Sequence, residues 1–218
     1  MCFSATASFT ASGVLTALGA ASVARGARGR YWLFAATPLL FAAQQAAEGI
    51  IWLTVDDPAP IALTRAATDA FLAIALVIWP IWLPLSLRTG EARPQRRRVL
   101  SAMMILGVLV SVAAVVLLSR WQPLAVVVHQ RIRYDRAGSL STVADVLVLL
   151  AYFSVTVAPL FISTIRLGRV LGVALIASLV AAALIERDSI TSVWCFFAAL
   201  LSGIMIMSVR DMPSPQAA

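Results

Sequence analysis

The sequence contains no lysine, because all 17 basic residues among its 218 are arginines. A retinal Schiff base needs a lysine amine, so a rhodopsin-type photoreceptor is excluded and retinal with it. The single histidine, His129, excludes a bis-histidine haem and the multi-histidine zinc sites of intramembrane hydrolases. The two cysteines, Cys2 and Cys195, are too few for a disulfide scaffold or a cluster of thiolate ligands.

Charge is scarce as well. Charged residues make up 12% of the chain and hydrophobic residues 61%, with a mean hydropathy of +0.93. Soluble domains are about one quarter charged and about half apolar, so the composition indicates an integral membrane protein. The net charge of +7 would suggest a nucleic-acid ligand in a soluble chain, but here the arginines lie mostly in short loops between apolar segments. We therefore expect the lipid bilayer as a partner, and no nucleic acid.

The apolar segments predict the architecture. A helix needs about 20 residues to cross a hydrocarbon core of about 30 Å. On this basis we expect an all-α polytopic membrane bundle with seven transmembrane helices in one domain, 1–210, followed by a disordered cytoplasmic tail, 211–218. The expected spans are 5–24, 31–53, 66–87, 99–119, 142–163, 170–186 and 190–209.

Two further features are predicted within this plan. In the long outer loop, about 120–141, a β-branched run over 124–134 passes into polar/apolar alternation, which predicts a short strand or hairpin on the bundle. Near the end of the third span, Pro80 and Pro84 should kink or end the helix.

The arginines also predict the orientation of the chain. They concentrate in the loops after the first, third, fifth and seventh spans, and positively charged loops stay in the cytoplasm. We therefore expect the amino terminus outside, the carboxyl terminus in the cytoplasm, and a location in a bacterial cytoplasmic (inner) membrane. The arginines on the predicted cytoplasmic side are Arg25, Arg28, Arg30, Arg88, Arg93, Arg96, Arg97, Arg98, Arg166, Arg169 and Arg210.

One acidic residue, Glu48, lies inside the second span. A charge at the centre of a membrane helix costs about 3 kcal/mol on insertion scales, so it normally faces a bundle interior, a partner or a cavity. Gln44 lies four residues earlier on the same helix face, and Gln45 adjoins it. Arg65, a proton or a bound cation are candidate partners for the carboxylate.

The other acids of the outer half suggest a pocket. Asp69 and Asp145 fall near the predicted outer starts of the third and fifth spans. Together with Glu48, Gln44 and Gln45 they predict a polar, acidic pocket that opens outward and binds a small ligand. Asp69 and Asp145 can equally be capping residues that complement a helix dipole.

Cys2 offers a second kind of chemistry. Removal of the initiator methionine would leave a terminal amine beside a thiol, which together form a metal chelate and a reactive nucleophile. A metal site of Cys2 and Glu48 is one hypothesis, with a metal ion or haem left open as the cofactor. The alternative is that Cys2 is a small residue packed at an interface.

The opening Met1-Cys2-Phe3-Ser4-Ala5-Thr6-Ala7-Ser8-Phe9, followed by Pro38, Gln44-Gln45 and Glu48-Gly49, resembles a family of bacterial multi-pass membrane proteins of unknown function. The resemblance implies an inner-membrane protein. It carries no known activity, ligand or catalytic residue.

Three functional hypotheses follow. The first is a sensor or transporter that binds a small ligand or metal ion around Glu48. The second is a structural or accessory subunit in which Glu48 locks helices together. A homo-oligomer, or a separate signalling or membrane partner, is left open. The third is a Cys2-dependent redox protein. Enzyme chemistry is disfavoured, because no Gly-x-Ser-x-Gly or His-Glu-x-x-His motif occurs and His129 has no nucleophile nearby in sequence.

Overall fold

The protein is mostly helical. The computed structural model describes residues 4–24, 32–56, 61–128, 131–135, 142–165, 167–185 and 199, with the side chains of all of these except 142–146. The elements are α1 (Ala5–Ala24), α2 (Trp32–Ala35), α3 (Thr37–Thr54), α4 (Ile61–Leu72), the π-helix η1 (Ala73–Ile78), α5 (Trp79–Gly90), α6 (Pro94–Trp121), β1 (Leu124–Val128), β2 (Arg131–Asp135), α7 (Thr142–Ile162) and α8 (Gly168–Ile185).

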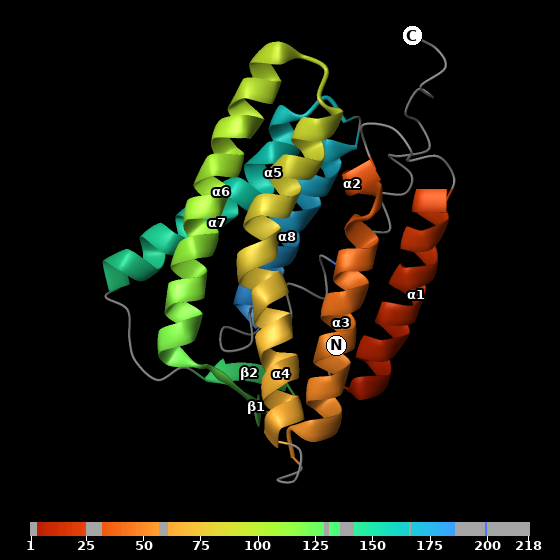
Figure 1. Cartoon of the computed structure of the whole chain (residues 1–218), viewed down its shortest axis with the longest axis vertical. Coiled ribbons are helices and arrows are strands. Elements are labelled where there is room, and N and C mark those ends of the chain that lie inside the picture. Colours follow the sequence, from red (N-terminus) through yellow and green to blue (C-terminus); the bar gives the residue numbers. More distant parts are fainter. Residues whose placement is uncertain are drawn as a thin grey trace.

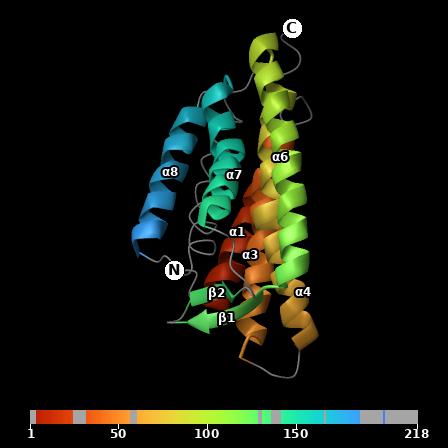
Figure 2. The same cartoon turned by 90° about the vertical axis from the view of Figure 1, so that its left-hand side faces the viewer.

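The helices form an elongated bundle (Figure 1). α1 packs along α3, and α3 packs along α4. α4, η1 and α5 make one continuous helical run that α6 follows back in the opposite direction. α7 lies against α5 and α6, and α8 packs on α7 (Figure 2). The β1–β2 hairpin lies at the end of the bundle where α3 meets α4, and the turn between α5 and α6 lies at the other end (Figures 1 and 2). We call these the hairpin end and the arginine end.

Among the described residues, three helical runs are long and apolar enough to cross a membrane: Ala5–Ala24, Ile61–Gly90 and Pro94–Trp121. Leu147–Ile162 and Gly168–Leu184 are apolar but shorter. Helices occupy the first six ranges predicted from the sequence, so the predicted helical character of the chain is confirmed, with the β1–β2 hairpin as its one described sheet. The seventh range and the tail lie outside the described residues, apart from Ala199.

Small residues let α1 approach α3 closely. A Cβ at Gly49 would lie 2.8 Å from the Phe9 ring, so a larger residue there would push the ring out of its position. The Ser12 hydroxyl donates a 2.9 Å hydrogen bond to the Ala42 carbonyl across the same interface. Helix pairs in membranes are commonly built this way, since small residues bring backbones together and polar ones add hydrogen bonds. The amino-terminal helix α1 therefore packs against α3 next to Gly49, the residue after Glu48.

The π-helix explains why the third helical run does not end at its prolines. In the widened register, the Trp79 amide donates to the Ile74 carbonyl. The next bond in that register would join Pro80 to Ala75, but proline has no N–H to donate. The Tyr152 hydroxyl of α7 donates to the Ala75 carbonyl instead, at 2.6 Å. The helix therefore continues to Gly90, so the predicted end of the helix at Pro80 or Pro84 is wrong.

The predicted hairpin is confirmed. β1 and β2 pair antiparallel, with Ala125 opposite Tyr134 and Val127 opposite Ile132. Ala125 and Ile132 are buried against α3 and α4, and the Tyr134 ring stacks on Phe71 with centroids 5.1 Å apart. The hairpin therefore covers the bundle at the carboxyl end of α3.

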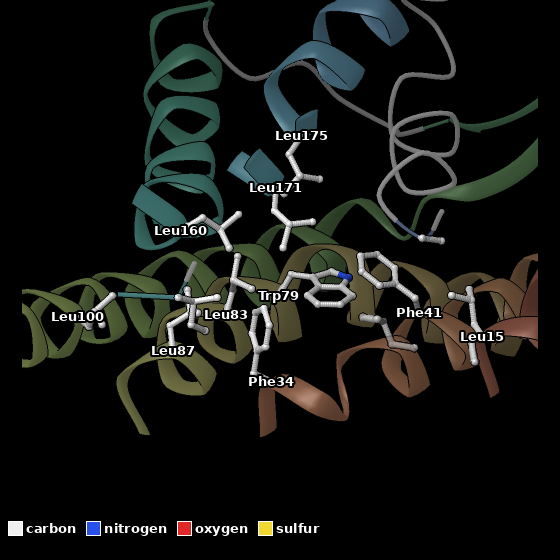
Figure 3. Close-up of a cluster of buried hydrophobic side chains, with 14 residues drawn as sticks. Leu15, Phe34, Phe41, Trp79, Leu83, Leu87, Leu100, Leu160, Leu171 and Leu175 are labelled. Atoms are coloured by element: carbon white, nitrogen blue, oxygen red, sulfur yellow. The ribbon is translucent and has the colours of Figure 1, made fainter. Parts of the chain in front are cut away.

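The main core joins both halves of the bundle. Phe41 of α3 and Trp79 of α5 meet Leu160 of α7 and Leu171 of α8, as Figure 3 shows. A second apolar cluster lies nearer the hairpin end, around Ile51 and Phe71. The residues between these clusters on α3 form the site described next.

Candidate functional site

The buried stripe of α3 is interrupted by polar side chains. Phe41 and Ile51 belong to the two apolar clusters, and between them Gln44, Gln45 and Glu48 are each 0% exposed. Spacings of three and four residues place all five on neighbouring faces of the helix. We call Gln44, Gln45 and Glu48 the α3 polar cluster. Two amides and a carboxylate are thus enclosed within an apolar core.

Gln44 is held by an aromatic residue of the neighbouring helical run. The Trp79 indole Nε1 donates a 2.8 Å hydrogen bond to Gln44 Oε1. The Trp79 ring also packs on Phe41, with centroids 4.1 Å apart (Figure 3). The bond fixes the amide so that its oxygen faces Trp79. Gln44 Nε2 is buried and has no hydrogen-bond partner within the described part of the chain.

Gln45 is the most unusual member of the cluster. Both polar atoms of its carboxamide are buried, and neither has a hydrogen-bond partner among the described residues. The indole Nε1 of Trp52, seven residues further along the same side of α3, is likewise buried and has no hydrogen-bond partner in the described part of the chain. Burying an amide without hydrogen bonds costs about 1–3 kcal/mol on the evidence of protein variants. Natural structures rarely leave such a group without a partner.

Glu48 lies one turn beyond Gln44 and is fully buried, as the sequence predicted for a charge inside a span. Arg65, a candidate partner for this carboxylate, donates instead to Gln122 Oε1 at 2.8 Å. That bond joins α4 to the residue after α6, at the hairpin end. Gln122 itself takes the left-handed conformation, with φ 42°, where α6 ends.

The remaining predicted site residues lie elsewhere. The Asp69 side chain is exposed on α4, one residue after buried Thr68. Asp145 belongs to α7, but its side chain is outside the described part, and so is Cys2. Within the described residues, no three His, Cys, Asp or Glu side chains group as metal ligands. The structure therefore brings together Gln44, Gln45 and Glu48 of the five predicted ligand-binding residues.

Sequence reasoning missed a second buried acid, Glu91, which is 3% exposed at the arginine end. Its carboxylate accepts hydrogen bonds from the Arg93 amide at 3.0 Å and from the Thr164 amide and hydroxyl at 2.8 and 3.1 Å. Beside it, Arg96 donates to the Ile162 carbonyl at 2.9 Å. Glu91 thus joins the α5–α6 turn to the α7–α8 turn.

Two opposing effects act on this carboxylate. Burial alone would raise the pKa of Glu91, but the hydrogen bonds from Arg93 and Thr164 and the charge of Arg96 outweigh it and lower the pKa below its usual 4.5. Glu91 therefore stays ionised and is a structural anion. One feature of the sequence could have indicated this role. Glu91 lies shortly before Pro94, which begins α6, and acidic residues just before a helix commonly accept hydrogen bonds from its first backbone amides.

In the described part of the chain, the fold and the site define an α-helical protein with three candidate membrane-spanning helices and a buried amide–carboxylate cluster on α3. The chain belongs to the family of unknown function DUF6629, whose model matches residues 1–218. The family of unknown function inferred from the opening motif is thereby confirmed. No curated protein and no solved structure is significantly similar to the chain.

Proposed function

We propose that this protein is an integral protein of a bacterial inner membrane that binds a small polar ligand or cation at the α3 polar cluster, as a sensor or transporter does. The proposal includes seven spans, with the amino terminus outside and the carboxyl terminus in the cytoplasm. The three long apolar helical runs support membrane integration, and the arginine-rich loops support the orientation.

The observation that carries the binding proposal is the Gln45 carboxamide. It is 0% exposed, and its donor and its acceptor are both without a hydrogen bond in the described part of the chain. If position 45 served only to pack the core, an apolar residue would be favoured there, because it would avoid the desolvation cost of the amide. A bound group that supplies the missing hydrogen bonds removes the penalty.

The polar atoms define the chemistry of such a group. Gln45 Oε1 and the Glu48 carboxylate are hard oxygen donors suited to a metal cation or an ammonium-type cation. Gln45 Nε2 and Gln44 Nε2 carry N–H groups that can donate hydrogen bonds to a carbonyl oxygen of a ligand. The cluster therefore favours a compact cation, or a small molecule that carries both an amine and a carbonyl group.

Thermal unfolding of the purified full chain in detergent tests the proposal. The probes are Na⁺, K⁺, Ca²⁺, Zn²⁺, guanidinium, ammonium and acetamide, each at millimolar concentration. A ligand at one hundred times its Kd stabilises the folded state by about 2.7 kcal/mol, so one probe should raise the unfolding temperature by several degrees. Gln45→Leu should abolish this shift, whereas Gln95→Leu, at an exposed glutamine of α6, should retain it.

The result also separates binding from a purely structural role. Without probe, Gln45→Leu should unfold at the wild-type temperature or above, because it removes an unbonded amide. If no probe shifts wild type, or if the Gln45→Leu variant responds equally, the binding proposal fails. The same screen with Cys2→Ser and elemental analysis tests the Cys2 metal hypothesis, which requires a stoichiometric metal that this variant loses.

The accessory-subunit hypothesis has one observation in its favour. The bond from Trp79 to Gln44 fastens α5 to α3, so part of the polar cluster already serves the packing of the bundle. Under that hypothesis both Gln44→Leu and Gln45→Leu lower stability and no probe binds.

A further inference from the structure

The structure assigns a binding surface for the headgroup of an anionic phospholipid to Arg97 and Arg98, at the amino-terminal end of α6. This inference rests on the membrane integration proposed above, but not on the α3 polar cluster. Its basis is the distribution of charge and exposure along α6.

Two exposed arginines at the arginine end, Arg97 and Arg98, have no acidic neighbour among the described residues. Arg93, Arg97 and Arg98 are exposed, whereas Arg96 is half-buried and donates to the Ile162 carbonyl. Glu91 is the sole acid at this end within the described ranges, and it is engaged by Arg93 and Thr164. The guanidinium groups of Arg97 and Arg98 therefore present a positive charge with no carboxylate beside it in the described structure.

An exposed apolar stripe begins directly below Arg98. Four apolar residues of α6 lie on the same helix face as Arg98, because they follow it at helical spacings of seven, four, three and four residues. These residues are Ile105, Leu109, Val112 and Val116, between 41% and 61% exposed. No described segment covers them, which is expected of a helix face in contact with lipid tails.

The length of this stripe matches one bilayer. No charged residue occurs from Val99 to Ser119, and exposed Arg120 closes the stripe at the hairpin end. At 1.5 Å per residue, Arg98 and Arg120 are about 33 Å apart along the helix, close to the hydrocarbon thickness of about 30 Å. Arg97 and Arg98 therefore lie at the depth of the phosphate groups of one leaflet.

The positive charge of Arg97 and Arg98 favours an anionic lipid headgroup as the ligand of this surface. Guanidinium groups bind phosphate oxygens through paired N–H donors, and several basic residues beside a membrane helix favour anionic over zwitterionic lipids. Acyl chains on the Ile105–Val116 stripe place a headgroup beside Arg98. A net-negative headgroup such as phosphatidylglycerol satisfies both features, whereas phosphatidylcholine brings its own cation to the surface.

Lipid retention of the purified full chain tests this inference. Protein delipidated in detergent is mixed with equal amounts of phosphatidylglycerol and phosphatidylcholine, and the bound lipids are counted by native mass spectrometry. Wild type should retain phosphatidylglycerol preferentially. Because each basic residue near a membrane surface contributes about a five-fold preference, Arg97→Gln together with Arg98→Gln should lower the ratio by more than ten-fold. Arg120→Gln, a single arginine at the other end of the same helix, should lower the ratio far less than the double variant does.

Three results would overturn the inference: equal retention of both lipids by wild type, an unchanged ratio in the double variant, or an equal loss in Arg120→Gln. Displacement of the lipid by millimolar inorganic phosphate would also overturn it, since it would show a free-phosphate site. Gln45→Leu should keep the lipid preference, so failure of the ligand proposal is seen separately. Release of the protein from membranes by alkaline carbonate would instead refute membrane integration itself.

Discussion

The Trp79 indole donates a hydrogen bond to the Gln44 amide oxygen at 2.8 Å, between two side chains separated by 35 positions in the sequence. The bond links the helix that carries the polar cluster to the helix that follows the π-helix. Since both groups are buried, the loss of one leaves the other without a partner.

Trp79→Phe should therefore destabilise the protein by about 1–3 kcal/mol from the unpaired amide alone. Adding Gln44→Leu should recover part of this loss, because the orphaned amide is removed along with its donor. A double-mutant cycle from unfolding in denaturant measures this coupling. Trp32→Phe, at a residue 52% exposed, is the matched control and should change stability little; a cycle with no coupling would contradict the assigned bond.

Gly49 and Gly13 should respond oppositely to alanine. At Gly49 the new methyl group would lie 2.8 Å from the Phe9 ring, whereas at Gly13 nothing lies within 4 Å. Gly49→Ala should lower stability by about 1–3 kcal/mol through overpacking, and Gly13→Ala should leave it unchanged or slightly raised. Thermal unfolding in detergent measures both. Phe9→Leu should partly rescue Gly49→Ala, and equal stability of the two alanine variants would show that the Phe9 ring does not restrict the space at Gly49.

The pKa of Glu91, lowered from its usual 4.5, predicts a stability loss in acid. The ionised carboxylate stabilises the folded state fully above pH 4.5, and this contribution disappears as the pH falls through the lower folded-state pKa, because the unfolded chain then binds more protons. Glu91→Gln should be less stable at pH 7 and show a flatter decline below pH 4.5. Unfolding in denaturant from pH 7 to pH 3 measures the slope, and exposed Asp56→Asn is the control. Parallel curves for Glu91→Gln and wild type would contradict the assigned role.

Glu48→Gln separates ligand binding from helix locking. The substitution keeps the shape and removes the charge, so a cation site should lose at least ten-fold in affinity while the protein stays folded and inserted. If Glu48 only locks helices, the unfolding temperature falls and no probe response changes. Comparing probe-induced thermal shifts of wild type and this variant distinguishes the two outcomes.

Much of the architecture followed from simple patterns in the sequence. The charge-free run between Arg98 and Arg120 predicted α6 closely, and the β-branched run from Leu124 predicted the hairpin. The burial of Glu48 followed from the cost of a charge in an apolar span. Each of these features is local, so neighbouring residues alone carry the signal.

Features that depend on tertiary packing were not accessible in this way. The prolines at 80 and 84 suggested a break, but Tyr152 of α7 supplies the hydrogen bond that Pro80 cannot make, and its position is set by the fold. The role of Glu91 depends on Thr164, which is 73 residues away. Asp69 shared the sequence signature of a pocket acid but lies on an exposed helix face.

The central claim, that the α3 polar cluster holds a ligand, is tested most directly by NMR of the glutamine side-chain amides in ¹⁵N-labelled protein. The Gln45 Nε2 resonances are assigned by their absence in Gln45→Leu, with exposed Gln95 as an internal control. The account predicts that the probe that raises the unfolding temperature shifts the Gln45 resonances with the same saturation curve and leaves Gln95 unmoved. Unmoved Gln45 resonances at saturating probe would place the binding site elsewhere and contradict the claim.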